Sequence, residues 1–555
     1  MSAHSIHPVK RRPLNLMFLL LLAATTAFAD DVAEIKPQLH MVPMRDGTKL
    51  ATDVYLPSEG KPPFPVIFAR GPYGKGGLKR HGQRYCRQGY ALVAQDIRGR
   101  HQSEGHHAII FHHGGWAKNR DGHDSLLWIA EQPWCNGRVA TIGGSALGIT
   151  QNMLAPDAPD VLCGQIPFVA FSNMYNQAAY QGGVWRKSLL EGWLTATGMV
   201  DVNLETFRAH PNYDEFWAEL NPEAQAHRAN APAAFVGGWY DIFLQGTINA
   251  YVALQNNGGP KARGNCKLVI GPIAHGPFTE LKYPPNANMQ LGDFNTRLLE
   301  YWLKGKQNGI TQQKPVRYYV MGDPTDEQAP GNFWREVNVW PPPSRNEPFY
   351  FHADGRLASG EPPSEAAMLT YRYDPRNPVP TVGGQNLRLP KGPMDQRKVE
   401  SRSDVLLFTS ETLAEPVEVT GRIIANLFIS SDCPDTDFTV KLSDVYPDGR
   451  SMLVTDGILR ARFRKSFEHH QLLEPGQVCP LAVDLWSTSL VFNRGHRIRI
   501  AVSSSNAPRF EPNPNTGGNQ MSDEEARIAT NNLHFSATHP SHIVLPVYDE
   551  AAETR

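Results

Sequence analysis

The sequence predicts an α/β protein, in which a doubly wound, mostly parallel sheet with a helical cap insertion is followed by an all-β jelly roll. Three observations lead to this prediction. Apolar runs of strand length alternate with helical segments in the first half of the chain. A stretch rich in Trp, Tyr, Asn and Ala interrupts them, and short β-rich runs broken by Gly, Pro and Asp fill the last part. Continuous apolar runs are typical of strands covered on both faces, as in a parallel sheet between helices.

The predicted sheet takes up the first half of the chain. Residues 38–44 and 50–56 alternate apolar and polar side chains around Asp46-Gly47, which predicts a hairpin. Residues 125–131 have the spacing of a helix. The runs that predict strands buried on both faces are 65–69, 90–94, 138–142, 161–169, 234–236 and 267–270.

A chain of 555 residues is too long for a single hydrophobic core, so several domains are expected. The sheet domain is predicted at 30–170 and 232–325, interrupted at 171–231 by a helical cap that can wall a pocket. Pro341-Pro342-Pro343 marks a boundary, and the jelly roll is predicted at 340–555. Its strands are expected among 423–430, 438–442, 481–485 and 498–502.

The first 29 residues have the pattern of an export signal. Lys10, Arg11 and Arg12 precede the apolar run 16–24, and Ala27-Phe28-Ala29 offers the small residues needed for cleavage. The run is too short for a stable membrane span, although a permanent N-terminal anchor is the alternative. We therefore expect a secreted or periplasmic protein, cleaved near Ala29 and not attached to a membrane afterwards.

Charge and cysteine content exclude some classes of function. The 54 basic and 55 acidic residues nearly cancel, so nothing favours nucleic acid or an anionic membrane as a partner. The six cysteines form no C-x-x-C pair and no zinc pattern. A disulfide between Cys433 and Cys479 and buried free thiols are both compatible with export.

Ser145 lies where an apolar strand runs into the small-residue turn 143–146, and a helical segment follows from Ile149. Such an elbow strains the serine and exposes its hydroxyl, and the N–H of Ala146 at the helix start can bind an oxyanion. The common G-x-S-x-G pattern would have its last glycine at 147, whereas this chain has it at 148. A Gly-Gly-Ser turn by itself is also compatible with a purely structural role.

Two further residues complete the set that acyl transfer requires. Asp241 follows the strand predicted at 233–238, and His275 follows the one at 267–271. Carboxyl ends of parallel strands meet at one edge of a sheet, so both side chains are expected near Ser145. The order Ser, Asp, His is that of the α/β-hydrolases. Taken alone, Asp241 could be a helix N-cap and His275 an ordinary loop histidine.

Besides the elbow, short motifs are spread along the chain at 44–48, 70–73, 95–100, 103–105, 132–138, 237–241, 271–275, 349–357 and 506–510. Together they resemble the superfamily of bacterial cocaine esterases and Xaa-Pro dipeptidyl-peptidases, which includes α-amino-acid ester hydrolases and glutaryl-cephalosporin acylases. The resemblance covers nearly the whole chain after the leader. In this family the elbow is commonly G-x-S-x-x-G, which agrees with Gly148.

The resemblance implies a serine hydrolase that forms a covalent acyl-enzyme with Ser145, Asp241 and His275 as its triad. It also implies an oxyanion hole made by the phenol of Tyr73 and the N–H of Ala146. A phenol on the loop after a strand can donate to an oxyanion in place of a second backbone N–H. A packed turn aromatic is the alternative for Tyr73. This chemistry needs no metal and no cofactor.

Residues after the triad aspartate narrow the expected substrate. The α-amino-acid ester hydrolases hold an ammonium there with acidic residues, whereas this chain has Phe243 and Leu244. Burying an ammonium without a partner is costly, so neutral or aromatic acyl esters are expected to react better. Trp239, Tyr240 and Phe243 are pocket candidates, but Trp239 and Tyr240 could instead brace the Asp241 loop.

Several other interpretations stay open. A dipeptidyl-peptidase would need a carboxylate that captures a free amine, and a β-lactam or amide acylase is a third enzymatic choice. An inactive carbohydrate-binding protein is the non-enzymatic alternative, and the intact Ser, Asp and His set argues against it. The expected partner is a small-molecule ester or amide, and a homo-oligomer is open.

Histidines 106, 107, 112 and 113 are expected in a solvated loop, and Asp435, Asp437, Asp444 and Asp448 in turns rather than at a calcium site.

Overall fold

The computed structural model describes residues 34–106, 108–362, 365–518 and 525–553. The predicted signal peptide at 1–29 lies outside the described residues. The described residues from Ile35 onward form one compact unit. Among the residues described, no helix is both long enough and apolar enough to cross a membrane.

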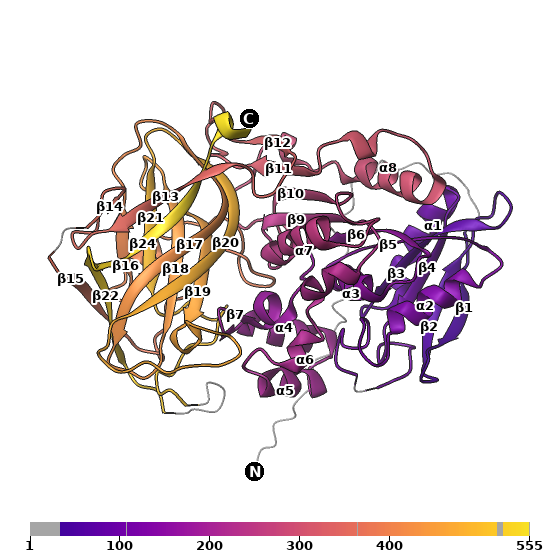
Figure 1. Cartoon of the computed structure of the whole chain (residues 1–555), viewed down its shortest axis with the longest axis horizontal. Helices are drawn as coiled ribbons and strands as arrows, with labels where there is room; N and C mark the ends of the chain where they lie inside the picture. Colours follow the sequence, from indigo (N-terminus) through magenta and orange to yellow (C-terminus); the bar gives the residue numbers. More distant parts are fainter. Residues whose placement is uncertain (1–33, 107, 363–364, 519–524, 554–555) are drawn as a thin grey trace, which may run out of the picture. The chain divides into compact units, whose positions relative to one another are not determined.

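A ten-stranded sheet forms the first half of this unit, in the order β1-β2-β4-β3-β5-β6-β9-β10-β11-β12 (Figure 1). The strands from β4 to β11 run parallel, whereas β1, β2 and β12 pair antiparallel at the two edges. The strand bounds are β1 (Gln38–Pro43), β2 (Lys49–Tyr55), β3 (Phe64–Gly71), β4 (Ala91–Asp96), β5 (Cys135–Gly144), β6 (Leu162–Phe168), β9 (Ala234–Tyr240), β10 (Lys267–Ala274), β11 (Val316–Val320) and β12 (Phe333–Val337).

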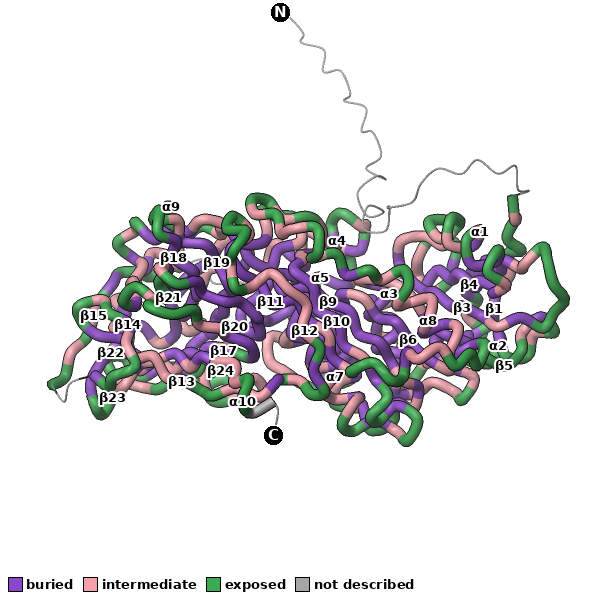
Figure 2. The backbone as a smooth tube through the Cα atoms, turned by 90° about the horizontal axis from the view of Figure 1, so that it is seen from above, coloured by how far each residue is buried: buried purple, intermediate pink, exposed green. Residues whose placement is uncertain are grey.

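Helices cover both faces of this sheet. On one face Tyr85 of α1 (Lys79–Arg87) and Leu298 of α8 (Leu291–Lys304) pack against the strands. On the other face Ile129 of α2 (Asp121–Ala130) and Leu154 of α3 (Ala146–Leu154) do the same. Every residue of β4 and β9 is buried, as Figure 2 shows for the centre of the sheet. This double coverage is the reason for the unbroken apolar runs in the sequence.

The segment between β6 and β9 is mostly helical and forms the cap. Its helices pack around an aromatic cluster that contains Tyr175, Tyr180 and Trp217. The sequence did not indicate the two short strands that precede the helices. The cap consists of a π-helical turn (Tyr175–Ala179), β7 (Tyr180–Gln181), β8 (Val184–Trp185), α4 (Lys187–Thr197), α5 (Asp201–Ala209), α6 (Glu215–Ala218) and a 3-10 helix (Pro222–Arg228).

After β12 the chain forms an antiparallel β sandwich with an eight-stranded and a four-stranded sheet. Leu427 of one sheet and Leu442 of the other belong to the same hydrophobic core. The predicted fold class is therefore confirmed, while the exact domain limits stay a prediction. The strands are β13 (Ser344–Phe351), β14 (Leu357–Ala358), β15 (Ala367–Tyr373), β16 (Leu406–Thr409), β17 (Val417–Ser431), β18 (Asp437–Val445), β19 (Ser451–Arg460), β20 (Cys479–Phe492), β21 (Arg497–Ser503), β22 (Ala529–Ser536), β23 (His539–Pro540) and β24 (His542–Tyr548).

The α-helices not yet named are α7 (Leu244–Asn257), which follows β9, and the short α9 (Arg397–Glu400) and α10 (Glu550–Glu553).

All six cysteines, each within the described residues, are free thiols. Cys433 and Cys479 are therefore not joined, and burial raises the pKa of the Cys433 thiol to about 11. The buried-thiol alternative holds for this residue.

A buried ion pair links the neighbouring strands β18 and β19. The Nε and Nη2 atoms of Arg460 donate to Asp437 at 2.8 and 2.9 Å, and both side chains are 1% exposed. Asp448 alone lies in a turn, where it accepts from the backbone N–H of Arg450. The turn interpretation is wrong for Asp437 and Asp444, which lie in β18 and pair with Arg460 and His496. Asp435 lies in the segment between β17 and β18, where it is buried and pairs with Arg462.

We predict that Arg460→Met destabilises the protein by about 3–5 kcal/mol, because it leaves the Asp437 carboxylate buried without its cation. The matched control is Arg422→Met, since Arg422 is 50% exposed where it pairs with Asp484. Loss of this exposed pair should lower the free energy of unfolding by less than about 1 kcal/mol. Urea unfolding measures the free energy of unfolding of both variants. Equal losses would contradict the claim that the buried Arg460–Asp437 pair matters more than the exposed pair.

Candidate active site

Ser145 sits at the sharp junction between β5 and α3, between Gly144, which ends the strand, and Ala146, which begins the helix. Its backbone has φ 55° and ψ −126°, a region that costs a non-glycine residue about 1–3 kcal/mol. Backbone hydrogen bonds maintain it, because its N–H donates to Phe168 O at 2.8 Å and its C=O accepts from Gly148 N at 2.8 Å. The predicted strand-to-helix elbow is therefore present.

The spacing of the glycines around the elbow follows from the packing of Leu147. A Cβ at Gly148 would lie 2.9 Å from the carbonyl oxygen of Phe168, so the helix approaches β6 too closely for a side chain there. The side chain of Leu147 instead fills the space beside Gly71 and Gly143, where a Cβ would lie 2.6 and 2.5 Å from its atoms. A glycine at 148 rather than 147 is what this arrangement requires.

Asp241 and His275 come from the carboxyl ends of the adjacent parallel strands β9 and β10, as predicted. His275 Nε2 lies 3.1 Å from Ser145 Oγ, and His275 Nδ1 lies 2.7 Å from Asp241 Oδ2. Asp241 is fully buried, and its other oxygen accepts from the N–H of Phe243 at 2.8 Å. The structure thus brings together three residues that are 34 to 130 positions apart in one hydrogen-bonded series.

Tyr73 lies on the loop that follows β3 and faces the same serine. Its phenol is hydrogen-bonded to Ser145, and it accepts a hydrogen bond of 3.0 Å from Trp193 Nε1 in α4. Burial raises the pKa of the Tyr73 phenol, so it stays protonated near neutral pH. Ala146 is the first residue of α3, where a backbone N–H has no partner within the helix.

Aromatic rings form a continuous series of contacts from His275 to Trp193. Phe243 meets the His275 ring edge-on at 5.9 Å between ring centroids and meets Phe171 at 5.4 Å. Phe111 meets Phe171 at 5.8 Å and stacks on Trp193 at 6.1 Å. Of these rings only Phe243 was a pocket candidate from the sequence. The aromatic content of the cap was the available signal for Phe171 and Trp193, but it does not say which rings join this series.

Trp239 and Tyr240 lie in a different hydrophobic cluster from Phe243 and Ala146. The Trp239 indole donates to Tyr319 O at 2.7 Å, and the Tyr240 hydroxyl donates to Leu453 O at 2.8 Å. Both side chains are almost fully buried by these contacts. This arrangement agrees with the bracing alternative, in which they fix the end of β9 just before Asp241.

A loop from the C-terminal half of the chain also reaches the site. Lys391 Nζ donates to the carbonyl oxygen of His275 at 3.2 Å, and Lys391 and Thr279 exchange two further hydrogen bonds. Leu387 on the same loop packs against the aromatic cluster of the cap. Nothing in the sequence pattern indicated these contacts, because they join residues more than a hundred positions apart.

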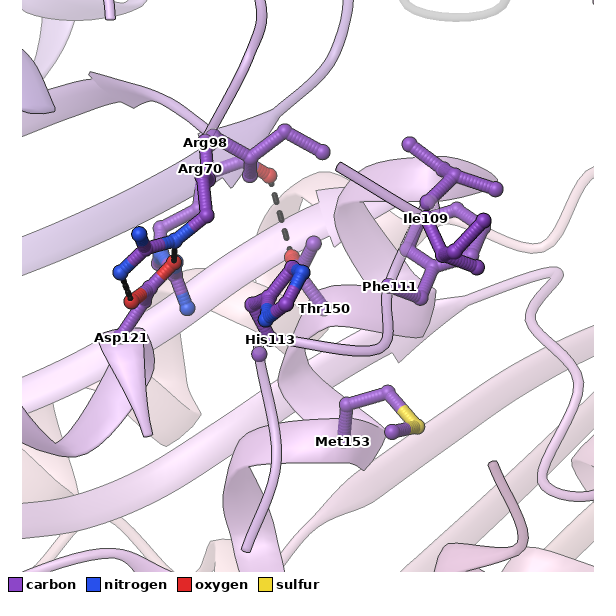
Figure 3. Close-up of a pocket in the computed structure, with 11 residues that line it drawn as sticks. Arg70, Arg98, Ile109, Phe111, His113, Asp121, Thr150 and Met153 are labelled. Carbon is purple, nitrogen blue, oxygen red and sulfur yellow. Dashed lines mark hydrogen bonds and ion pairs between the residues drawn. The ribbon is translucent and has the colours of Figure 1, made fainter. Parts of the chain in front are cut away.

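A small cavity of about 20 Å³, with room for one water molecule, lies between Arg70 of β3, the segment 109–114, and Thr150 and Met153 of α3 (Figure 3). Arg98 pairs with Asp121 on its wall at 2.6 Å, and Thr150 Oγ1 donates to Arg70 O at 3.0 Å. His113 also lines the cavity, and burial lowers its pKa to about 4.

The histidines expected in a solvated loop have mixed environments. His106 is exposed, as expected, and His107 lies outside the described residues. His113 is half-buried and its Nδ1 accepts a hydrogen bond from Asn119 Nδ2 at 2.7 Å, so the solvated interpretation is wrong for it. His112 pairs with Glu219 of the cap at 2.6 Å. In the described part of the chain no cluster of three His, Cys, Asp or Glu could hold a metal ion.

The fold and the serine at its elbow define the class of the protein, a serine hydrolase with the α/β-hydrolase fold. Sequence comparison specifies the family. The sequence model of the X-Pro dipeptidyl-peptidase (S15 family) matches residues 46–203 and 194–277. The X-Pro dipeptidyl-peptidase C-terminal non-catalytic domain matches residues 308–544. The cocaine esterase of Rhodococcus sp. (strain MB1 Bresler) is 34% identical over 582 residues, covering 91% of this chain and 97% of the esterase.

Two solved structures share the fold over almost their whole length. An aminopeptidase from a marine sediment archaeon, Thaumarchaeota archaeon, superposes with a TM-score of 0.79 at 25% identity, covering 95% of this chain and 99% of that one. An α-amino acid ester hydrolase superposes with a TM-score of 0.78 at 24% identity, covering 96% and 100%. The chain belongs to the X-Pro dipeptidyl-peptidase (S15) and cocaine esterase family, which confirms the resemblance read from its motifs.

We predict that Gly71→Ala destabilises the protein by about 1–3 kcal/mol, because the added methyl group overlaps Leu147. In the double variant with Leu147→Ala the total loss should be smaller than the sum of the two single losses. Gly77→Ala is the control, since no atom lies within 4 Å of its Cβ position. Thermal unfolding checks this, and strict additivity would contradict the packing account of the elbow.

Proposed function

We propose that this protein hydrolyses carboxylic esters through a covalent acyl-enzyme on Ser145. The observation that carries the proposal is the position of the His275 ring, 3.1 Å from Ser145 Oγ on one side and 2.7 Å from Asp241 on the other. A hydroxyl becomes a useful nucleophile only when a base in hydrogen-bond reach removes its proton. The membership in a hydrolase family and the similarity to a protein named cocaine esterase support the same reaction.

In the proposed mechanism His275 Nε2 takes the Ser145 proton as Oγ bonds to the carbonyl carbon. Asp241 accepts from Nδ1–H, which fixes the tautomer and stabilises the imidazolium. The imidazolium then gives its proton to the leaving alcohol oxygen as the ester C–O bond breaks. A water molecule, deprotonated by the same ring, attacks the acyl-enzyme and releases the acid together with free Ser145.

We assign the oxyanion hole to the Tyr73 hydroxyl and the Ala146 N–H. Both are donors at the place where charge develops on the carbonyl oxygen, and the phenol is already in hydrogen-bond contact with Ser145. Because burial raises the pKa of Tyr73, its proton is retained for donation. Fixed donors of this kind stabilise the tetrahedral intermediate without reorganisation during the reaction.

The aromatic lining favours a neutral or aromatic acyl group. Phe243 contacts the His275 ring, and the three positions after Asp241, Ile242 to Leu244, carry no charge. An ammonium placed there would lose its water without gaining a partner. Hydrolysis of Xaa-Pro peptides is the second candidate, supported by the family model, and it requires a carboxylate elsewhere that binds the substrate amine.

Export is part of the proposal. It rests on the basic residues, the apolar run and the small residues near Ala29 in the first 29 positions. Edman sequencing of the protein recovered outside the cytoplasm should start at or near Asp30. A protein that keeps its first residues would contradict cleavage.

We predict that Ser145→Ala lowers kcat for p-nitrophenyl esters by about 10⁴-fold or more, since the triad acts as a unit. Tyr73→Phe should lower kcat by about 100- to 1000-fold, as for other single oxyanion donors. Ser401→Ala and Tyr350→Phe, which change the same groups in the jelly roll, should leave turnover within about twofold. Wild-type turnover of the Ser145 variant would overturn the proposal.

We predict a higher kcat/KM for phenylacetate methyl ester than for phenylglycine methyl ester, which differs from it by an ammonium. An unpaired ammonium in an aromatic pocket costs binding energy in the transition state. Glycyl-prolyl anilide should be a poor substrate for the same reason. Faster turnover of the amino ester, or efficient release of glycyl-proline, would favour the peptidase alternative.

A further inference from the structure

The hydroxyl of Tyr73 has a second fixed neighbour besides Ser145, namely the indole of Trp193 in the cap. The indole Nε1 lies 3.0 Å from the phenol oxygen. An indole N–H is only a donor, so the Tyr73 oxygen accepts from Trp193 and keeps its own hydrogen for another acceptor. The direction of this hydrogen bond thus turns the phenol into a donor aimed away from the cap.

Trp193 is itself held in place from two sides. Its ring stacks on Phe111 with centroids 6.1 Å apart and an interplanar angle of 8°. Its helix, α4, is anchored by the buried side chains of Leu190 and Leu194. The indole therefore cannot turn away without breaking the packing of the cap core.

One arginine links the end of α4 to the loop that carries Tyr73. Arg100 Nη2 donates to Thr197 O at 2.7 Å and Nη1 to Gly198 O at 3.3 Å, both at the end of α4. The same guanidinium reaches Pro72 O with Nε at 3.4 Å, directly before Tyr73. The distance between the helix and the loop is therefore set independently of the Trp193–Tyr73 hydrogen bond.

We infer that Trp193 is a positioning residue that orients the Tyr73 hydroxyl toward the oxyanion through its Nε1–H. This inference rests on the proposed oxyanion role of Tyr73. It gives the cap a second role, because the cap would then orient a group of the catalytic site as well as form a wall of the pocket. A hydroxyl that accepts one hydrogen bond is a stronger donor in the next, because chains of hydrogen bonds polarise one another.

The test is a double-mutant cycle on kcat with p-nitrophenyl esters. Trp193→Phe keeps an aromatic ring and removes the N–H, and it should lower kcat about three- to tenfold, the range expected for one neutral hydrogen bond. In the Tyr73→Phe background the same substitution should change kcat by less than about twofold, because no hydroxyl is left to orient. A change in KM that persists in both backgrounds reports the separate loss of pocket wall.

Trp217→Phe is the matched control, since its Nε1 donates to His210 O at 2.8 Å within the cap core. It should lower the melting temperature and leave kcat within about twofold. Melting curves of all variants establish that each is folded at the assay temperature. An equal loss of kcat from Trp193→Phe in both backgrounds would overturn the inference and leave Tyr73 in its role. No loss from Tyr73→Phe itself would instead overturn the proposed oxyanion hole.

Discussion

The strained backbone of Ser145 is the constraint on which the rest of the site depends. A positive φ at a non-glycine residue persists only where the surroundings enforce it. Here the carbonyl of Phe168 and the first turn of α3 enforce it through backbone hydrogen bonds, and glycines at 143 and 148 leave the space. Because the elbow fixes Oγ at the carboxyl end of β5, residues at the carboxyl ends of β9 and β10 can reach it with short side chains.

The site draws on parts of the chain that lie outside the sheet. The cap contributes Trp193, and the C-terminal half contributes Lys391 on the His275 carbonyl and Leu453 as acceptor for Tyr240. These contacts give the jelly roll and its preceding loops a structural role, since they brace the strand end before Asp241 and the loop of His275. The surroundings of the hydrogen-bonded series are thus held by segments that are separate in sequence.

The sequence alone was enough to find eight of the ten sheet strands, without β11 and β12, and the three residues in the hydrogen-bonded series. Each lies directly after an apolar run, and parallel strands bring such positions to one edge by geometry. The aromatic neighbours Phe171 and Trp193 were not predictable, because a cap rich in aromatic residues does not reveal which ring contacts which. Phe111 lies outside the cap, on the loop between β4 and α2, where no sequence pattern indicated it. Partners far apart in the sequence were not predictable either. The register of β18 and β19 places Arg460 beside Asp437, and local turn propensity, which predicted a turn for Asp437, contains no information on that register.

The most direct test of the central claim is to react the native protein with a fluorophosphonate probe and to map the adduct by peptide mass spectrometry. Such probes modify a serine only when a neighbouring base activates it. The account predicts one adduct per chain, on Ser145, and its loss in the His275→Ala variant. An adduct on another serine, or an unmodified native protein, would contradict it.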